Sequence, residues 1–258
     1  MAGHEGKFIW YELLTDDVAA ARDFYAGIVG WNTRDAGGEN TGYILLLAGD
    51  RGVGGIMAIP EEARAAGAQP GWTGYIAVAD TDAAAARIEA AGGTIHRAPG
   101  DIPNVGRFAV VADPQGAVFQ LLTSRGDGAM TPLDRMAPGN VGWHELYSTD
   151  WEAGFAFYAD QFGWAKDQAV DMGPMGTYQL FAPAPGAEAI GGMMNMPDLP
   201  KPAWGFYFVV EGIDAAAERV KAAGGQVVMG PMEVPDGSFV IQGRDLQGAM
   251  FALVSKTR

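Results

Sequence analysis

Glu12 stands two residues after Trp10, and Glu145 stands two residues after Trp143, in two similar segments of the chain. Side chains two residues apart on a strand share a face, so each carboxylate should project beside its indole. Desolvation raises the pKa of a carboxyl group toward the range of a general base. A tryptophan ring stacks on flat or cationic groups. The pattern suggests two proton-abstracting bases, or two anchors for a ligand's hydroxyl or amine.

A structural interpretation stays open, in which both glutamates hydrogen-bond the backbone at a sheet edge and their recurrence records only a duplication. The same alternation predicts that Tyr11 and His144 point to the opposite face. Further ligand contacts are expected on the face of the glutamates and on the strands beside it. They are Trp10 and Trp143 themselves, Tyr147, Ile76, Val78 and Gln120, and in the second segment Tyr207, Val209 and Met250.

These segments belong to a unit that occurs twice. Residues 8–31 match residues 141–164, sharing the tryptophan, the glutamate, a Phe-Tyr pair and a Gly-Trp pair. Residues 71–122 match residues 203–254, sharing DAAA and AAGG segments and a DPQGAVF or DLQGAMF ending. Duplication of this extent indicates two domains. We predict a first domain at 1–125, a Gly-, Pro-, Asp- and Met-rich linker at 126–139, and a second domain at 140–258.

Each copy alternates strand and helix signals. An extended run at 8–14 leads to Asp16 and Asp17, which suit a helix N-cap, and apolar residues at helical spacing follow until Gly30. Strands at 43–47 and 54–59 and a loop at 60–70 come next. The order restarts with a strand at 75–79, a helix ending near 91, and strands at 108–112 and 117–122. Each copy is predicted to hold two βαβββ modules, and four modules make an α+β protein with curved mixed sheets.

Paired βαβββ modules, a TDD or STD segment followed by FY and GW, and a DP-x-G strand ending resemble the vicinal oxygen chelate family across essentially the whole chain. This family includes glyoxalases, bleomycin-resistance proteins and extradiol dioxygenases. Within it, the chain is most similar to two-repeat actinobacterial proteins labelled glyoxalase-like or hydroxylase, a group that includes a mycobacterial antigen. The resemblance implies two tandem glyoxalase-like domains with ligand clefts, but a fold does not fix a function.

The resemblance also implies positions for metal ligands. Carried over to this sequence, they fall on Trp10 and Trp143, on Gly74 and Gly205, and on Gln120 and Ala252. Gly74 and Gly205 are the residues six positions before the acids that are expected to lead the next helix, Asp80 and Glu211. The remaining ligand would come from 53–58 or 190–196, which hold no carboxylate and no histidine. Imidazole and carboxylate ligands cannot be assembled from these positions. We expect no family-type metal and no other cofactor.

The net charge and the composition limit the kinds of molecule that this protein is expected to bind. The 31 acidic and 17 basic residues give a net charge of −14, which repels nucleic acid. The chain has no cysteine, no apolar signal core and no run long enough for a membrane span, so a cytoplasmic location is expected. The sequence is compatible with either a monomer or a homodimer.

The sequence leaves three possible functions open, and two of them have positive features in their favour. One is a lyase, isomerase or cofactor-free oxygenase that acts on a small carbonyl or aromatic compound, with Glu12 or Glu145 as the base. The other is a binding protein that sequesters a hydrophobic or aromatic antibiotic or metabolite without chemistry. A pseudo-enzyme with a protein partner is a third, for which the sequence supplies no positive feature.

Overall fold

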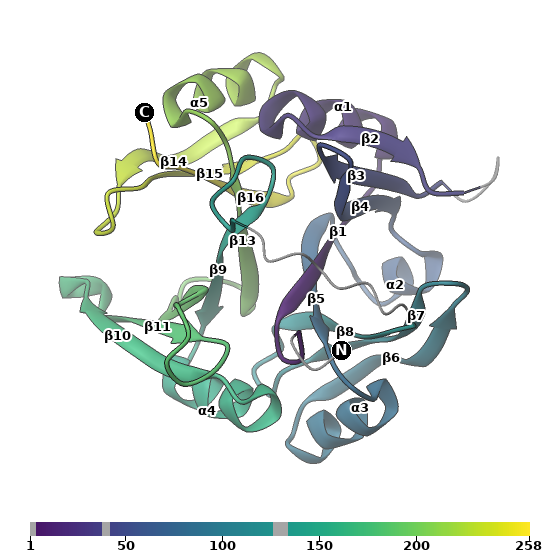
Figure 1. Cartoon of the computed structure of the whole chain (residues 1–258). Helices are drawn as coiled ribbons and strands as arrows, with labels where there is room; N and C mark the ends of the chain where they lie inside the picture. Colours follow the sequence, from purple (N-terminus) through teal and green to yellow (C-terminus); the bar gives the residue numbers. More distant parts are fainter. Residues whose placement is uncertain (1–3, 38–41, 126–133) are drawn as a thin grey trace. The chain divides into compact units, whose positions relative to one another are not determined.

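Two eight-stranded mixed sheets, one from each repeat, form the framework of the protein in a computed structural model that describes residues 4–37, 42–125 and 134–258. The elements of the first repeat are labelled in Figure 1 and are β1 (Phe8–Thr15), α1 (Val18–Val29), β2 (Asn32–Asp35), β3 (Ile44–Ala48), β4 (Arg51–Ala58), α2 (Glu61–Ala65), β5 (Gly71–Ala77), α3 (Thr81–Ala90), β6 (Thr94–Ile102), β7 (Gly106–Ala112) and β8 (Val118–Ser124). The second repeat contains β9 (Val141–Ser148), α4 (Trp151–Phe162), β10 (Ala165–Asp171), the short 3-10 helix η1 (Gly173–Met175), β11 (Thr177–Ala182), β12 (Gly191–Asn195), β13 (Ala203–Val209), α5 (Ile213–Ala222), β14 (Gln226–Glu233), β15 (Phe239–Arg244) and β16 (Met250–Ser255).

The strand orders of the two sheets are equivalent. They are β2-β3-β4-β1-β5-β8-β7-β6 and β10-β11-β12-β9-β13-β16-β15-β14. Strand β1 runs parallel to β4 and β5 runs parallel to β8, whereas β2–β3, β3–β4, β6–β7 and β7–β8 are antiparallel. The α+β class and the tandem βαβββ modules predicted from the sequence are confirmed. The loop expected at 60–70 contains the short helix α2.

Short polar side chains start three of the four long helices. Asp17, Asp80 and Asp150 are N-caps, and each accepts a hydrogen bond from a backbone N–H of the first turn. Gly30 ends α1 in the left-handed conformation at φ 87°, which glycine adopts without strain. Helix α5 differs, because its N-cap is Gly212. The sequence comparison had aligned Glu211 with Asp80, one residue too early.

The chain divides into two compact units, and each unit draws on both repeats. Among the described residues, the first unit holds 4–10, 73–125 and 144–204, and the second holds 11–37, 42–72, 134–143 and 205–258. Helices α3 and α4 contact each other in the first unit, as α1 and α5 do in the second. The predicted linker therefore lies partly in the second unit, and its residues 126–133 lie outside the described part of the chain.

A fully buried tyrosine lies in the core of each unit. In the first unit the Tyr158 hydroxyl donates to Asp113 Oδ2 at 3.1 Å and accepts from Trp204 Nε1 at 2.9 Å. In the second unit the Tyr25 hydroxyl donates to Asp245 Oδ2 at 3.1 Å, and its ring packs edge-on against Trp72 at 5.0 Å between centroids. The repeated Phe-Tyr pair and DP-x-G turn are therefore parts of one buried contact.

Candidate functional site

The alternation of β1 sorts its side chains between two environments. Leu13 and its register partner Ile56 are fully buried, on the side where α1 contacts β4. Glu12 is paired with Gly55 on the opposite face and is 6% exposed. A Cβ atom added at Gly55 would overlap the ring of Tyr43. Glu12 and Tyr43 therefore share one face of the sheet in the second unit, because register partners on parallel strands project to the same side.

The first unit holds a corresponding face with one more functional group. Glu145 pairs with Gly192, and a Cβ atom at Gly192 would overlap the ring of Tyr178. The hydroxyl of Tyr147 donates a short hydrogen bond to Glu145 Oε2. Glu145 is 7% exposed. A nearly buried carboxylate, a phenol bonded to it and a second phenol ring thus gather on this face.

Tyr11 and His144 lie on the other side of their strands, among aromatic rings. Tyr11 packs edge-on against Phe206 with 5.3 Å between ring centroids. Burial raises the pKa of the Tyr11 hydroxyl, although nearby Arg135 and Arg51 act to lower it. His144 stacks on Phe8 at 4.6 Å, and its Nδ1 lies 2.7 Å from the Ile190 carbonyl oxygen. The two glutamates consequently project away from these aromatic contacts.

On β5 the structure corrects the sequence assignment. Tyr75 is the register partner of Gln120, and Ile76 is the partner of Leu121. Ile76 and Leu121 are both fully buried. Gln120 therefore shares its face with Tyr75, whereas Ile76 and, by alternation, Val78 belong to the opposite face. The error came from aligning Asp80 with Glu211, since a shift of one residue exchanges the faces of a strand.

The corresponding face of the second repeat is an apolar cluster in the second unit. Tyr207 and Val209 pair with Ala252 and Val254, as expected from the sequence. With Val240 they form a buried cluster, against which Trp143, Met136 and Val234 pack. Gln242 Nε2 donates to the Tyr207 hydroxyl at 2.8 Å. Met250, a predicted ligand contact, is 43% exposed.

The segment before β9 contributes to this cluster. A Cβ atom at Gly142 would lie 2.9 Å from Met136 Sδ, so the glycine permits close packing of the methionine. Arg135 donates a short hydrogen bond to the Gly142 carbonyl oxygen, and its guanidinium lies over the Trp143 ring at 5.7 Å. Arg51 donates to the Asn140 side chain. Trp143, which the sequence predicted to stack on a ligand, is therefore itself held by a cation and an apolar cluster.

The described residues do not fit a metal of the family type. No three or more His, Asp or Glu side chains of residues 4–37, 42–125 and 134–258 lie close enough together to hold a metal ion. The site glutamates are each paired in register with a glycine, which offers no side-chain donor. Besides the one glutamate of each face, the donors described there are phenols and amides, which are poor substitutes for imidazole and further carboxylate ligands.

Four polar groups on these faces were not predicted from the sequence: Tyr43, Tyr178, Tyr75 and Gln242. Tyr43 and Tyr178 each stand at or near the start of an apolar segment that is followed by a Gly-Gly pair. This shared arrangement was the available signal. Gln242 has no such signal, because the corresponding strand β7 carries no glutamine.

The family model described as the Glyoxalase/Bleomycin resistance protein/Dioxygenase superfamily matches residues 7–121 and 140–253. The chain belongs to this superfamily. It is 32% identical over 256 residues to "Putative glyoxylase CFP32" of Mycobacterium tuberculosis, covering 97% of this chain and 95% of the relative. It is 30% identical over 261 residues to "Anthracycline biosynthesis protein DauV" of a Streptomyces species, covering 90% and 87%. The family resemblance predicted from the sequence is confirmed.

Solved structures of the superfamily share the fold at low identity. The Mn(II)-bound glyoxalase from Novosphingobium aromaticivorans aligns with a TM-score of 0.68 and 18% identity, over 99% of this chain and 83% of that one. A 2,2',3-trihydroxybiphenyl 1,2-dioxygenase from Sphingomonas wittichii aligns with a TM-score of 0.66 and 14% identity, over 96% and 89%. Among the described residues, no helix is long and apolar enough to cross a membrane.

Proposed function

We propose that this superfamily member binds a small carbonyl or aromatic compound at the face of Glu145, Tyr147 and Tyr178 and moves a proton on it without the family metal. The observation that carries the proposal is the buried Glu145 carboxylate that accepts a hydrogen bond from Tyr147. A carboxylate in such surroundings suits a general base, and buried ionisable groups mark functional sites more often than exposed ones do.

The proposed step is proton abstraction next to a carbonyl group. The C–H bond next to the ligand's carbonyl group breaks, the proton goes to a Glu145 carboxylate oxygen, and the electron pair moves through the new C=C bond onto the carbonyl oxygen. Return of the proton at another atom completes an isomerisation, and departure of a leaving group completes an elimination. Neither course needs an oxidant. The Tyr147 hydroxyl orients the carboxylate, and the Tyr178 ring offers a flat surface to the ligand.

The Glu12 face in the second unit is proposed as a second base and ligand position. Leu14 stands where the other repeat has Tyr147, so Glu12 lacks that phenol. Trp10, Trp143, Tyr207, Gln120 and Met250 are proposed as ligand contacts. An aromatic ligand agrees with the relative named as an anthracycline biosynthesis protein. A cytoplasmic location and a monomeric or homodimeric state remain predictions.

Sequestration without chemistry is the alternative, and one feature of the second unit favours it. The cluster around Tyr207 and Val254 is apolar, and the Trp143 ring packs against it. The partly exposed Trp143 ring, backed by this buried cluster, suits an aromatic molecule bound by burial and stacking alone. The domains at 1–125 and 140–258 would then be two binding domains.

Thermal-shift screening of aldehydes, thiols and polycyclic aromatics, an anthracycline among them, identifies ligands. Mass spectrometry of the ligands after incubation detects conversion. For a converted ligand, Glu145→Gln should lower kcat about 100-fold or more, because it removes the base, and should leave Kd within about threefold. Tyr147→Phe should lower kcat less, by about tenfold, because it removes one hydrogen bond to a charged group.

The outcomes separate the two functions. Tight binding with no conversion by the wild-type protein supports sequestration. Conversion that survives both Glu145→Gln and Glu12→Gln rules out the proposed bases.

A further inference from the structure

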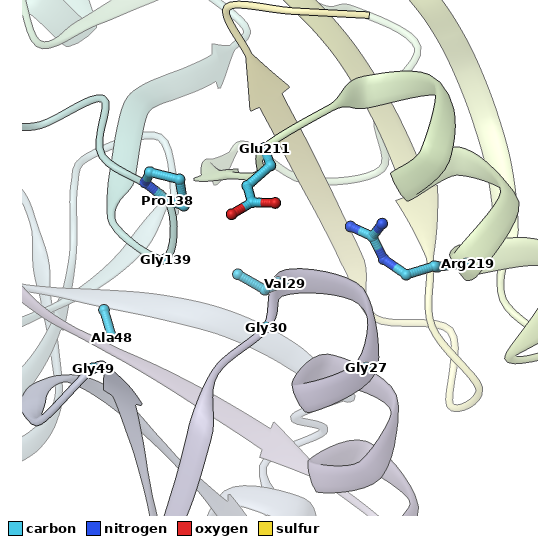
Figure 2. A pocket seen from close by; sticks show the side chains of 9 residues that line it. All are labelled: Gly27, Val29, Gly30, Ala48, Gly49, Pro138, Gly139, Glu211 and Arg219. Atoms are coloured by element: carbon cyan, nitrogen blue, oxygen red, sulfur yellow. The ribbon is translucent and has the colours of Figure 1, made fainter.

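A pocket of about 330 Å³ lies in the second compact unit, and none of the proposed catalytic or ligand-contact residues lines it. Its walls come from the end of α1, the turn between β3 and β4, the segment before β9, and the loop and helix that follow β13 (Figure 2). Seven of its nine lining residues are glycine, alanine, valine or proline. Only Glu211 and Arg219 bring charged side chains, so these two must dominate recognition.

Both charged groups are available to a ligand. Figure 2 shows the Glu211 carboxylate and the Arg219 guanidinium directed into the same pocket space. Within the described part of the chain, the Glu211 carboxylate has no hydrogen bond or ion pair, whereas its backbone oxygen accepts from Ser255 Oγ at 3.0 Å and from Thr257 Oγ1. Arg219 Nη2 donates to the Ile28 carbonyl oxygen at 3.0 Å. That bond fixes the guanidinium at the pocket wall and leaves its other N–H groups to donate to an anion.

The end of α1 adds a negative partial charge. Gly30 closes this helix, and its N–H donates to the Ala26 carbonyl oxygen at 3.0 Å. The last turn of α1 holds no basic side chain. A helix C-terminus attracts cations, and the Arg219 guanidinium already lies at this one, so Glu211 is the group that favours an ammonium group. Arg219 favours a carboxylate. The net charge of −14 disfavours ligands with a net negative charge, which leaves a neutral zwitterion as the best match.

The equivalent place in the first unit carries different side chains at two positions. Arg87 occupies the position that corresponds to Arg219, but Ala79 replaces Glu211 and Phe162 replaces Val29. The Phe162 ring packs at 5.8 Å from Trp164 and at 6.2 Å from Tyr158. The repeats thus differ at the acidic group and at the small wall residue, the two features on which the pocket depends.

We propose that this pocket binds a small neutral α-amino acid, with its carboxylate on Arg219 and its ammonium group on Glu211. This site is independent of the function proposed for Glu145.

Isothermal titration calorimetry on the full chain tests the proposal with L-glutamine as the probe. Saturable binding with a Kd of about 1 mM is expected for two partly exposed charge-assisted contacts. Two analogues divide the recognition: 4-aminobutanamide lacks the carboxylate and glutaramate lacks the amine. Each should bind at least about tenfold more weakly, because each loses one charged contact. Equal binding of either analogue, or no saturable heat with L-glutamine, would overturn the proposal.

Three variants locate the site. Glu211→Gln keeps the size of its side chain and removes the charge, and Arg219→Gln removes the guanidinium; each should weaken L-glutamine binding about tenfold. Val29→Phe copies the other repeat and should abolish binding by filling the wall, with circular dichroism and the melting temperature reporting whether it folds. Glu145→Gln is the control and should leave this affinity unchanged. Loss of L-glutamine binding in Glu145→Gln, or its retention in both Glu211→Gln and Arg219→Gln, refutes the location.

Discussion

Glu145 and Glu12 occupy equivalent strand positions but differ in their neighbours. Both pair with a glycine under a tyrosine ring, and only Glu145 accepts a hydrogen bond from a tyrosine two residues later. The sequence predicted the acids and their strand face, because alternation is a local property. It did not predict Tyr43 or Tyr178, because these residues lie in other segments of the chain. Their rings occupy the space that the missing side chains of Gly55 and Gly192 leave free. Side-chain groups assembled by strand pairing are not visible in local spacing.

Asp113 permits a prediction about stability and pH. Burial raises the pKa of its carboxyl group above the usual value, although N–H groups of Gln115 and Ala117 and the Tyr158 hydroxyl, which all donate to it, act in the other direction. The folded protein therefore binds this proton at a higher pH than the unfolded chain does. Burial of the charged Asp113 carboxylate lowers the free energy of unfolding at pH values above its folded-state pKa. This loss of stability disappears as the pH falls from the folded-state pKa toward the pKa of the unfolded chain.

Asp113→Asn removes this titration while keeping an oxygen that accepts from the turn. The difference in unfolding free energy between wild type and variant should therefore change in favour of the wild type as the pH falls from 7 to about 4. Urea unfolding at several pH values measures it. A difference that stays constant with pH would show that Asp113 titrates alike in both states.

At the scale of elements, β5 shows how an alignment error of one residue at a helix start assigns strand residues to the wrong face of the sheet. The acid before α5 was taken as Glu211, whereas the helix is capped by Gly212. That shift of one residue placed Ile76 on the face that Tyr75 occupies. Strand and helix positions were predictable from periodicity and caps, but the register between repeats depends on which residue starts the helix. An N-cap glycine gives no side-chain signal for that start.

A substitution at Gly192 on β12 tests whether the position of the Tyr178 ring contributes to stability and to ligand binding. An added Cβ atom at this position would overlap the Tyr178 ring. Gly192→Ala should therefore displace Tyr178, lower the unfolding free energy by about 1–3 kcal/mol and weaken ligand binding at the Glu145 face. Chemical unfolding and ligand titration measure both effects.

Gly100→Ala is the matched control, because the nearest atom to its added Cβ is the Ala98 carbonyl oxygen at 3.9 Å. It should change neither stability nor affinity noticeably. If Gly192→Ala behaves like this control, the ring is not held where we describe it.

In the whole molecule, each sheet follows one repeat, but each compact unit joins both. Tyr158 of the second repeat bonds Asp113 of the first inside one unit, and Tyr25 bonds Asp245 inside the other. The sequence predicted domains at 1–125 and 140–258 because similarity reveals duplication. It cannot reveal which copies share a core, since the two arrangements have the same repeat pattern.

We therefore predict that neither repeat folds alone. Fragments 1–125 and 126–258 should each lack cooperative thermal unfolding by circular dichroism, because each loses half of both aromatic cores. Mixing or co-expressing the fragments should restore it. A single fragment that melts cooperatively near the temperature of the full chain would support the two predicted domains as independent folding units.

We propose above that a carboxylate on the sheet face moves protons without a metal, whereas the glyoxalase of Novosphingobium aromaticivorans that shares this fold is Mn(II)-bound. The most direct measurement is turnover of an identified substrate after dialysis against a chelator, with metal content determined by mass spectrometry. Our account predicts unchanged kcat in metal-free protein and loss of about 100-fold or more in Glu145→Gln. Activity that disappears with the metal and returns with one equivalent of Mn²⁺, Zn²⁺ or Ni²⁺ would contradict it.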